Sequence, residues 1–266
     1  MPRANRFFIP DQVLHVTHRC HKQDYLLRFH KDRRNWIRWL FEARKRYDLK
    51  VLNYMVTSNH VHLLVTAAQL DTLQRSMQLI AGRTAQEYNQ RKHRKGAYWS
   101  LSASCLSRHL FIHELREDRY HATVVETNEH LWRCLVYIDL NMVRAGIVQH
   151  PSEWRDCGYH EIQHPPQRRR IIDRQLLMRL LNIKGERALQ QTHRQWIEAT
   201  IASGSLEKDT KWTRSLAVGS QAFVTDIKGQ LGIKSKYRQI DQDADSYILR
   251  EPEFAYTPLF EGKTGI

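Results

Sequence analysis

Apolar residues follow two different spacings along the first half of the chain. Short runs rich in apolar and β-branched residues, typical of β-strands, cover residues 12–19, 49–56, 60–67 and 121–126. Longer segments place apolar residues three and four positions apart, which indicates amphipathic helices over residues 31–47, 72–91 and 128–145. The turn-like TSN at residues 57–59 joins two of the strands and predicts a hairpin.

The order of these elements is strand, helix, strand, strand, helix, strand, helix. This order predicts an α+β fold: a ferredoxin-like antiparallel sheet with helices on one face. We expect a catalytic domain over residues 1–160, with an inserted segment at about residues 100–116 that precedes the fourth strand. Residues 161–266, which include a linker at HPPQRRR (164–170), read as a mostly helical C-terminal extension whose role the sequence does not show.

Charge narrows the class of partner. The chain of 266 residues carries a net charge of +14, with 41% hydrophobic and 10% aromatic residues, which are values of a globular protein. An excess of positive charge of this size favours a polyanionic partner, and nucleic acid is the first candidate. The sequence has no apolar stretch long enough to cross a bilayer and no signal-peptide pattern, so we expect a cytosolic protein with no membrane partner.

The four cysteines are scattered and form no Cys-x-x-Cys pair. They are Cys20, Cys105, Cys134 and Cys157. A cysteine-based zinc site needs closely spaced pairs, so these residues read as ordinary thiols in a reducing compartment.

The helix at residues 128–145 is apolar around most of its circumference and carries one polar stripe. The stripe contains His130, Arg133, Tyr137, Asn141 and Arg144. Polar groups on a buried helix need partners, so the stripe is expected to face a cleft or a phosphate. Tyr137 and Asn141 are four residues apart and therefore neighbours on that face.

The stretch TSNHVHLLV (57–65) holds a pair of histidines, His60 and His62, whose rings leave the same face of a strand. Two imidazoles at this spacing can bind a divalent cation from one side. If the last helix packs on that face, Asn141 supplies a carbonyl oxygen and Tyr137 lies one turn away. A phenol with a pKa of about 10 is a weak nucleophile, so it needs a metal that polarises the phosphoryl group. These parts predict a metal-dependent enzyme that cuts phosphodiesters with a tyrosine.

Several stretches resemble one protein family in the same order. SNHVHLLV resembles the His-hydrophobic-His signature of HUH endonucleases, and YIDLNMVRAGIV (137–148) resembles the tyrosine helix of the REP-associated tyrosine transposases of bacteria. Further stretches with this resemblance are GRTAQEYN (82–89), GAYW with DRYHATVVE, and PSEWRDCGY (151–159). The resemblance covers about residues 5–160 and is more specific than a His-x-His pair alone. The segment at 100–116 divides a motif that is near-continuous in the family.

The resemblance implies a function and a set of site residues. It implies a ferredoxin-like (RRM-like) domain that binds Mg²⁺ or Mn²⁺, with His60, His62 and Asn141 as metal ligands. Tyr137 is then the nucleophile that forms a covalent 5′-phosphotyrosine and releases a 3′-OH. The implied partner is single-stranded or hairpin DNA, such as REP-like palindromes, bound by a monomer or homodimer that is cytoplasmic and associated with the bacterial nucleoid.

Candidate DNA contacts are four arginines, and for each of them a solvated surface charge is the alternative interpretation. They are Arg19, Arg83, Arg133 and Arg144, and the basic stretches at 91–95 and 168–170 are candidates of the same kind. Tyr98 and Trp99 are open to two interpretations, as stacking residues for unpaired bases or as packing residues.

Two other functions stay open on the sequence alone. One is a catalytically silent DNA- or RNA-binding protein of the same fold, since basic charge and aromatic residues serve it equally well. The other is an RNA-directed or replication-initiator HUH nuclease. The single Tyr137 argues against initiators with two tyrosines on this helix.

Overall fold

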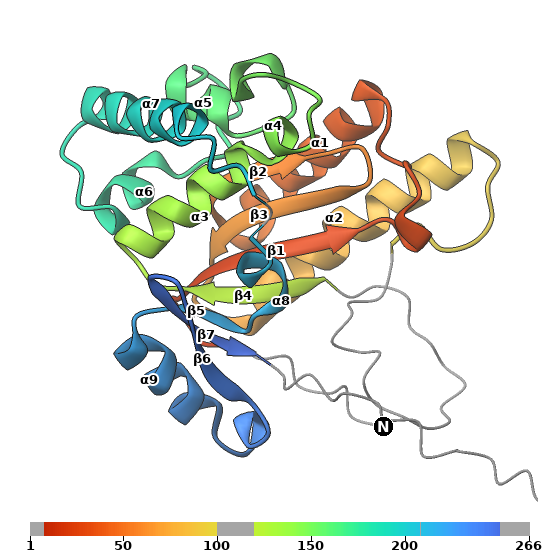
Figure 1. Cartoon of the computed structure of the whole chain (residues 1–266). Coiled ribbons are helices and arrows are strands. Elements are labelled where there is room, and N and C mark those ends of the chain that lie inside the picture. The colour runs from red at the N-terminus through yellow and green to blue at the C-terminus, as the bar shows by residue number, and fades with distance from the viewer. Residues whose placement is uncertain (1–7, 100–119, 208, 251–266) are drawn as a thin grey trace, which may run out of the picture.

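The computed structural model describes residues 8–99, 120–207 and 209–250. Over these residues, seven strands form one sheet in the order β2-β3-β1-β4-β5-β7-β6 (Figure 1). The strands are β1 (Val13–Arg19), β2 (Lys50–Val56), β3 (His60–Thr66), β4 (His121–Val125), β5 (Ala217–Gly219), β6 (Gln239–Asp243) and β7 (Ser246–Arg250). Neighbouring strands are antiparallel except for β4 and β5.

The helices complete a mixed α+β architecture, so the predicted fold class is confirmed. They are α1 (His30–Tyr47), α2 (Leu70–Arg91), α3 (Glu129–Asp139), α4 (Asn141–Arg144), α5 (Tyr159–Gln163), α6 (Arg174–Leu180), α7 (Glu186–Ala202), α8 (Lys211–Arg214) and α9 (Gln221–Leu231). Strands β1 to β4 with α1 and α2 follow the predicted order, and β1 lies between β3 and β4. The predicted insertion at 100–116 lies outside the described residues.

Helices cover both faces of the sheet, and the prediction of helices on one face was wrong. Helices α1 and α2 pack together behind the sheet in the view of Figure 1, whereas α3 and α8 lie in front of it. Strand β1 gives the physical reason, because Leu14 and Val16 point to one face and His15 to the other, and all three are at most 1% exposed. A strand that buries side chains on both faces needs cover on both.

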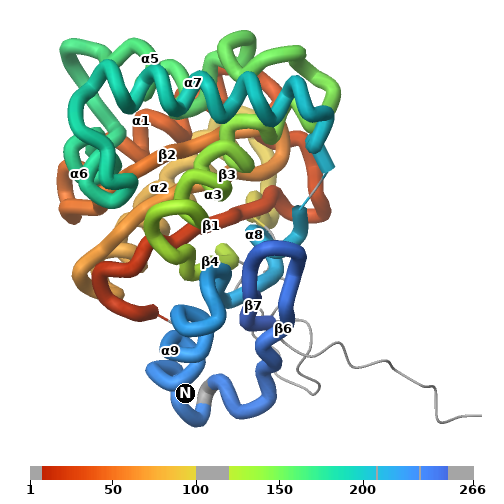
Figure 2. The backbone as a smooth tube through the Cα atoms, turned by 60° about the vertical axis from the view of Figure 1, so that its left-hand side comes forward, coloured from red at the N-terminus to blue at the C-terminus, as the bar shows by residue number. Residues whose placement is uncertain are grey.

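The C-terminal part of the chain is built onto the first part. Helix α7 packs on α3, where Trp196 stacks on Trp132 with 5.6 Å between ring centroids. Strand β5 extends the sheet beside β4, and the β6–β7 hairpin continues it (Figure 2). Helices α6, α7 and α9 agree with the prediction of a mostly helical extension, but the three strands were not predicted. Strand β6 has the sequence QIDQD, which lacks an apolar pattern, so the sequence does not predict that it pairs with β7.

The helix predicted over residues 128–145 is divided at Leu140, whose φ of −80° and ψ of 4° separate α3 from α4. Hydrogen bonds of helical spacing continue across this residue, since Leu140 N donates to Val136 O and Arg144 N to Leu140 O, both at 2.9 Å. The segment ends at Gly146 as predicted, where a φ of +66° requires the left-handed region. Asn141 therefore starts a new turn directly after the helix that carries Tyr137.

No helix in the described part of the chain is both long and apolar enough to span a membrane.

Candidate functional site

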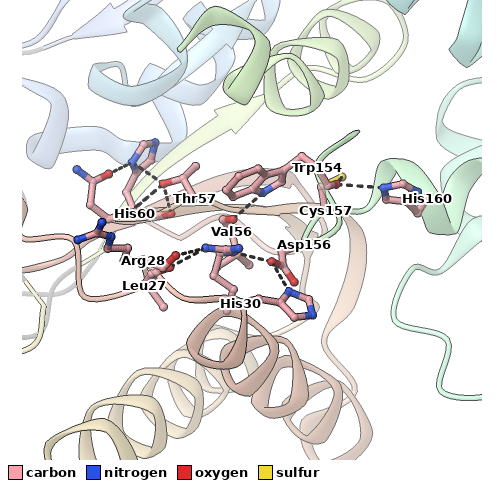
Figure 3. A network of polar contacts seen from close by, with 12 residues as sticks. Leu27, Arg28, His30, Val56, Thr57, His60, Trp154, Asp156, Cys157 and His160 are labelled. Carbon is pink, nitrogen blue, oxygen red and sulfur yellow. Dashed lines mark hydrogen bonds and ion pairs between the residues drawn. The ribbon is translucent and has the colours of Figure 1, made fainter. Parts of the chain in front are cut away.

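The two histidines lie at the beginning of β3, on the face covered by α3. Their ring centroids are 4.9 Å apart. The Nδ1–H of His60 donates to the side-chain oxygens of Asn59 at 2.7 Å and Thr57 at 2.9 Å, and the Thr57 hydroxyl itself donates to His60 O (Figure 3). We assign the proton to Nδ1 because the Asn59 oxygen only accepts. In the neutral ring the lone pair is then on Nε2.

A third histidine, His15 of β1, orients His62. His15 Nδ1 lies 2.8 Å from the backbone oxygen of Trp212 in α8, and its Nε2 lies 2.9 Å from His62 Nδ1. A carbonyl oxygen only accepts, so His15 carries its proton on Nδ1 and accepts the Nδ1–H of His62. Burial lowers the pKa of His15 to about 3 and that of His62 well below its usual 6.5. Both rings are neutral, and the lone pair of His62 is on Nε2.

Helices α3 and α4 bring Tyr137 and Asn141 to the same place. Asn141 Nδ2 is 3.0 Å from His62 Nε2, and the Tyr137 ring centroid is 5.9 Å from that of His62 and 6.1 Å from that of His15. The structure thus joins residues that are 79 positions apart in the sequence. Their proximity was predicted from the packing of this helix on the sheet.

The environment of Tyr137 is apolar on one side and cationic on the other. Its side chain is 6% exposed, and burial raises its pKa above the usual 10, which the nearby Arg144 guanidinium opposes. Arg144 Cζ lies 4.1 Å from the centre of the ring, and its Nη2 donates to the backbone oxygen of Tyr137. The Trp212 ring also lies near Tyr137, with 6.2 Å between the ring centroids. An arginine at this distance stabilises a phenolate that would otherwise be poorly solvated.

The donor set fits a divalent cation. His60 and His62 each hold a hydrogen on Nδ1, so each offers an Nε2 lone pair to a metal. The Asn141 amide can supply an oxygen as well, because a half turn of the amide exchanges its nitrogen, which faces His62, for its oxygen. No group of three His, Cys, Asp or Glu side chains that could hold a metal occurs among the described residues. A metal here therefore depends on the Asn141 amide as the third protein ligand.

The four candidate arginines lie in different places. Arg144 lies against Tyr137, and Arg19 is the cross-strand partner of His60 at the end of β1. Arg133 forms ion pairs with Glu129 and Asp245. Arg83 is on α2, over the ring of Trp39 and behind the sheet. The structure thus brings two of the four to the site and leaves two away from it.

The candidate stacking residues Tyr98 and Trp99 are packing residues. Both are buried, at 2% and 1% exposure, and both have hydrogen-bond partners: Tyr98 Oη donates to Leu26 O and Trp99 Nε1 to Ala81 O. In the neighbouring basic stretch, Arg91 forms an ion pair with Asp32, and Arg94 donates to backbone oxygens. These two arginines therefore hold the fold together.

Three cysteines agree with the interpretation as ordinary thiols, and Cys105 lies outside the described residues. Cys20, Cys134 and Cys157 are free and buried. Burial raises the pKa of all three thiols, to about 12 for Cys20. A thiol of such high pKa is unreactive at neutral pH.

Sequence reasoning missed His15 and Trp212. A signal existed for His15, because a polar residue at a position that β1 buries needs a partner. The contribution of Trp212 is a backbone oxygen, which any residue possesses, so no residue pattern could identify it.

Residues 11–133 match the family model described as transposase IS200 like. Tyr137 and Asn141 lie just beyond this match. No curated protein matches the chain.

Two solved structures show a low overall similarity to this chain. One is a REP-associated tyrosine transposase bound to a REP hairpin, at 13% identity and a TM-score of 0.43, covering 60% of this chain and 84% of that one. The other is described as a transposase from Deinococcus radiodurans, at 14% identity and a TM-score of 0.32, covering 56% and 94%.

Proposed function

We propose that this chain cuts and rejoins single-stranded or hairpin DNA through Tyr137, a function that agrees with the match of residues 11–133 to the model of the IS200-like transposase family. One observation carries the proposal. Tyr137 lies 5.9 Å from His62, ring to ring, and Asn141 lies 3.0 Å from the same histidine, although they come from different elements. This is the juxtaposition of nucleophile and ligands that a metal-dependent tyrosine enzyme requires.

The chemistry is a transesterification. The Tyr137 oxygen attacks a DNA phosphorus, a bond forms from that oxygen to phosphorus, and the bond from phosphorus to the 3′ oxygen breaks. The phenol loses its proton and the departing 3′ oxygen gains one, which leaves a 5′-phosphotyrosine and a free 3′-OH. Attack by another 3′-OH reverses these steps and joins two strands without ATP.

Each residue of the site has a proposed task. His60, His62 and Asn141 would hold Mg²⁺ or Mn²⁺, which when bound supplies Lewis-acid polarisation of the phosphoryl group. Arg144 stabilises negative charge on the Tyr137 oxygen, and Arg19, at the end of β1, is placed to contact a phosphate. His15 acts as a positioning residue, because its hydrogen bond holds His62 with the lone pair on Nε2.

A cleavage assay on end-labelled single-stranded and hairpin oligonucleotides tests the proposal. We expect cleavage with Mn²⁺ or Mg²⁺ and none in EDTA. We expect no cleavage by His62→Ala. His164 is an exposed histidine on the C-terminal side of α5, and we expect His164→Ala to cleave as wild type does. Tight DNA binding in EDTA together with no cleavage in any metal would instead identify a silent DNA-binding protein of this fold.

A further inference from the structure

The segment between β1 and α1, residues 20–29, borders the candidate site. Cys20 N donates to Asn59 O at 2.8 Å, and Leu27 N donates to Ser58 O at 2.9 Å. These bonds attach the segment to the turn from which His60 starts β3. The segment therefore lies beside the turn that precedes His60 in the chain.

Buried side chains and hydrogen bonds from α1 fix the segment to the rest of the protein. Leu26 and Leu27 are buried, at 8% and 0% exposure. Arg33 donates to the backbone oxygens of Leu27 at 3.1 Å and Arg28 at 2.6 Å while it pairs with the buried Asp156 (Figure 3). A surface fixed in this way is organised before any ligand arrives, which lowers the entropic cost of binding.

Two consecutive residues of the segment are in a strained conformation. Lys22 and Gln23 have φ values of 50° and 61°, the left-handed region that residues other than glycine rarely adopt. Gln23 O accepts a hydrogen bond from Asn59 Nδ2, so the strained residues face the His60 turn. Such strain persists only where the surroundings impose it, and it concentrates at functional sites.

The outer surface of the segment exposes two aromatic rings. Tyr25 is 67% exposed and Phe29 is 57% exposed, although the leucines between them are buried. Cations surround Phe29: Arg28 Cζ lies 5.9 Å and Lys92 Nζ 5.7 Å from its ring centroid. Exposed rings beside cations offer π-faces to bases and charges to phosphates.

We propose that Tyr25 and Phe29 form a stacking platform for unpaired bases of a DNA strand whose phosphate lies at Tyr137. This inference rests on the proposed function and adds the site that holds the strand. Single-stranded DNA fits better than duplex DNA, because bases in a duplex have no free face to stack on a ring. Charge complementarity selects DNA over an apolar protein segment, since Lys22, Arg28, Lys31 and Lys92 outnumber the exposed Asp24.

The test is a binding measurement that requires no chemistry. A fluorescent single-stranded oligonucleotide is titrated in EDTA with the full chain and with Tyr25→Ala, Phe29→Ala and the double variant. Loss of base stacking is expected to weaken binding roughly 10-fold for each ring. Tyr25→Phe should retain affinity, because stacking needs the ring and not the hydroxyl.

Matched controls separate stacking from charge and from folding. Tyr237, a tyrosine exposed at 74% on the C-terminal side, provides the control variant Tyr237→Ala, which should bind as wild type. Lys92→Gln should reduce the salt dependence of binding, whereas Phe29→Ala should lower affinity equally at all salt concentrations. Melting temperatures of the variants should equal that of wild type, since the rings are exposed.

Two outcomes distinguish this proposal from the proposed function. Unchanged affinity of the double variant overturns the platform, even if the chain cleaves DNA. A 10-fold or greater loss in the double variant supports the platform, even if no metal produces cleavage. The platform would also be overturned if the double variant bound a blunt duplex more weakly by the same factor, because the effect would then not depend on unpaired bases.

Discussion

Acid should destabilise this protein through His15, and the size of the effect can be calculated. His15 is fully buried, and its pKa is lowered from 6.5 to about 3. Between these pH values the unfolded chain binds a proton on this ring and the folded protein does not, so the free energy of unfolding decreases as the pH falls. From pH 7 to pH 5, His15 alone should remove about 2 kcal/mol, at 1.36 kcal/mol for each pH unit below 6.5. The loss should end near pH 3.

The variant His15→Gln isolates this contribution. Glutamine cannot titrate, yet its amide oxygen can accept the Nδ1–H of His62. The assay is urea unfolding, followed by tryptophan fluorescence in EDTA at pH 7, 6 and 5. Between pH 7 and pH 5, the free energy of unfolding should decrease by about 2 kcal/mol less for His15→Gln than for wild type. The exposed His164→Gln should keep the wild-type pH dependence. Equal pH dependence of wild type and His15→Gln would refute a buried neutral His15.

Other substitutions probe the scaffold and the site. In Gly158→Ala the new methyl would collide with the buried Asn53 side chain, so we expect the variant to lose roughly 1–3 kcal/mol in urea unfolding. Asp139→Ala should cost roughly 3 kcal/mol in the same assay, because it leaves the buried His193 and Asn53 without their acceptor; a loss below about 1 kcal/mol would contradict this. His15→Phe should weaken Mn²⁺ binding in calorimetry by about 10- to 100-fold, and His15→Gln should largely retain it, since only phenylalanine removes the acceptor that fixes His62.

Local patterns predicted the elements that carry the site. The apolar run after His62 marks β3, and the Tyr137 stripe marks the helix that covers it. Both signals are contained in a few neighbouring residues, and helical spacing relates Tyr137 to Asn141 without any tertiary information. The alternation along β3 likewise places His60 and His62 on one face.

Features that depend on distant backbone could not be predicted. The oxygen of Trp212 that holds His15 has no sequence signature, and β6 is a strand only because β7 pairs with it. The choice of stacking aromatics also depends on tertiary packing. Tyr98 and Phe29 both stand close to basic residues in the sequence, but the fold buries the first and exposes the second.

Tyr137 is the proposed nucleophile, and the decisive experiment is to look for its covalent adduct with DNA. Wild-type protein incubated with Mn²⁺ and a single-stranded oligonucleotide is denatured, digested and analysed by mass spectrometry. We expect one modified peptide with the phosphate of the DNA 5′ end on the oxygen of Tyr137, and no adduct with Tyr137→Phe. An adduct on another residue, or cleavage by Tyr137→Phe at the wild-type rate, would contradict it.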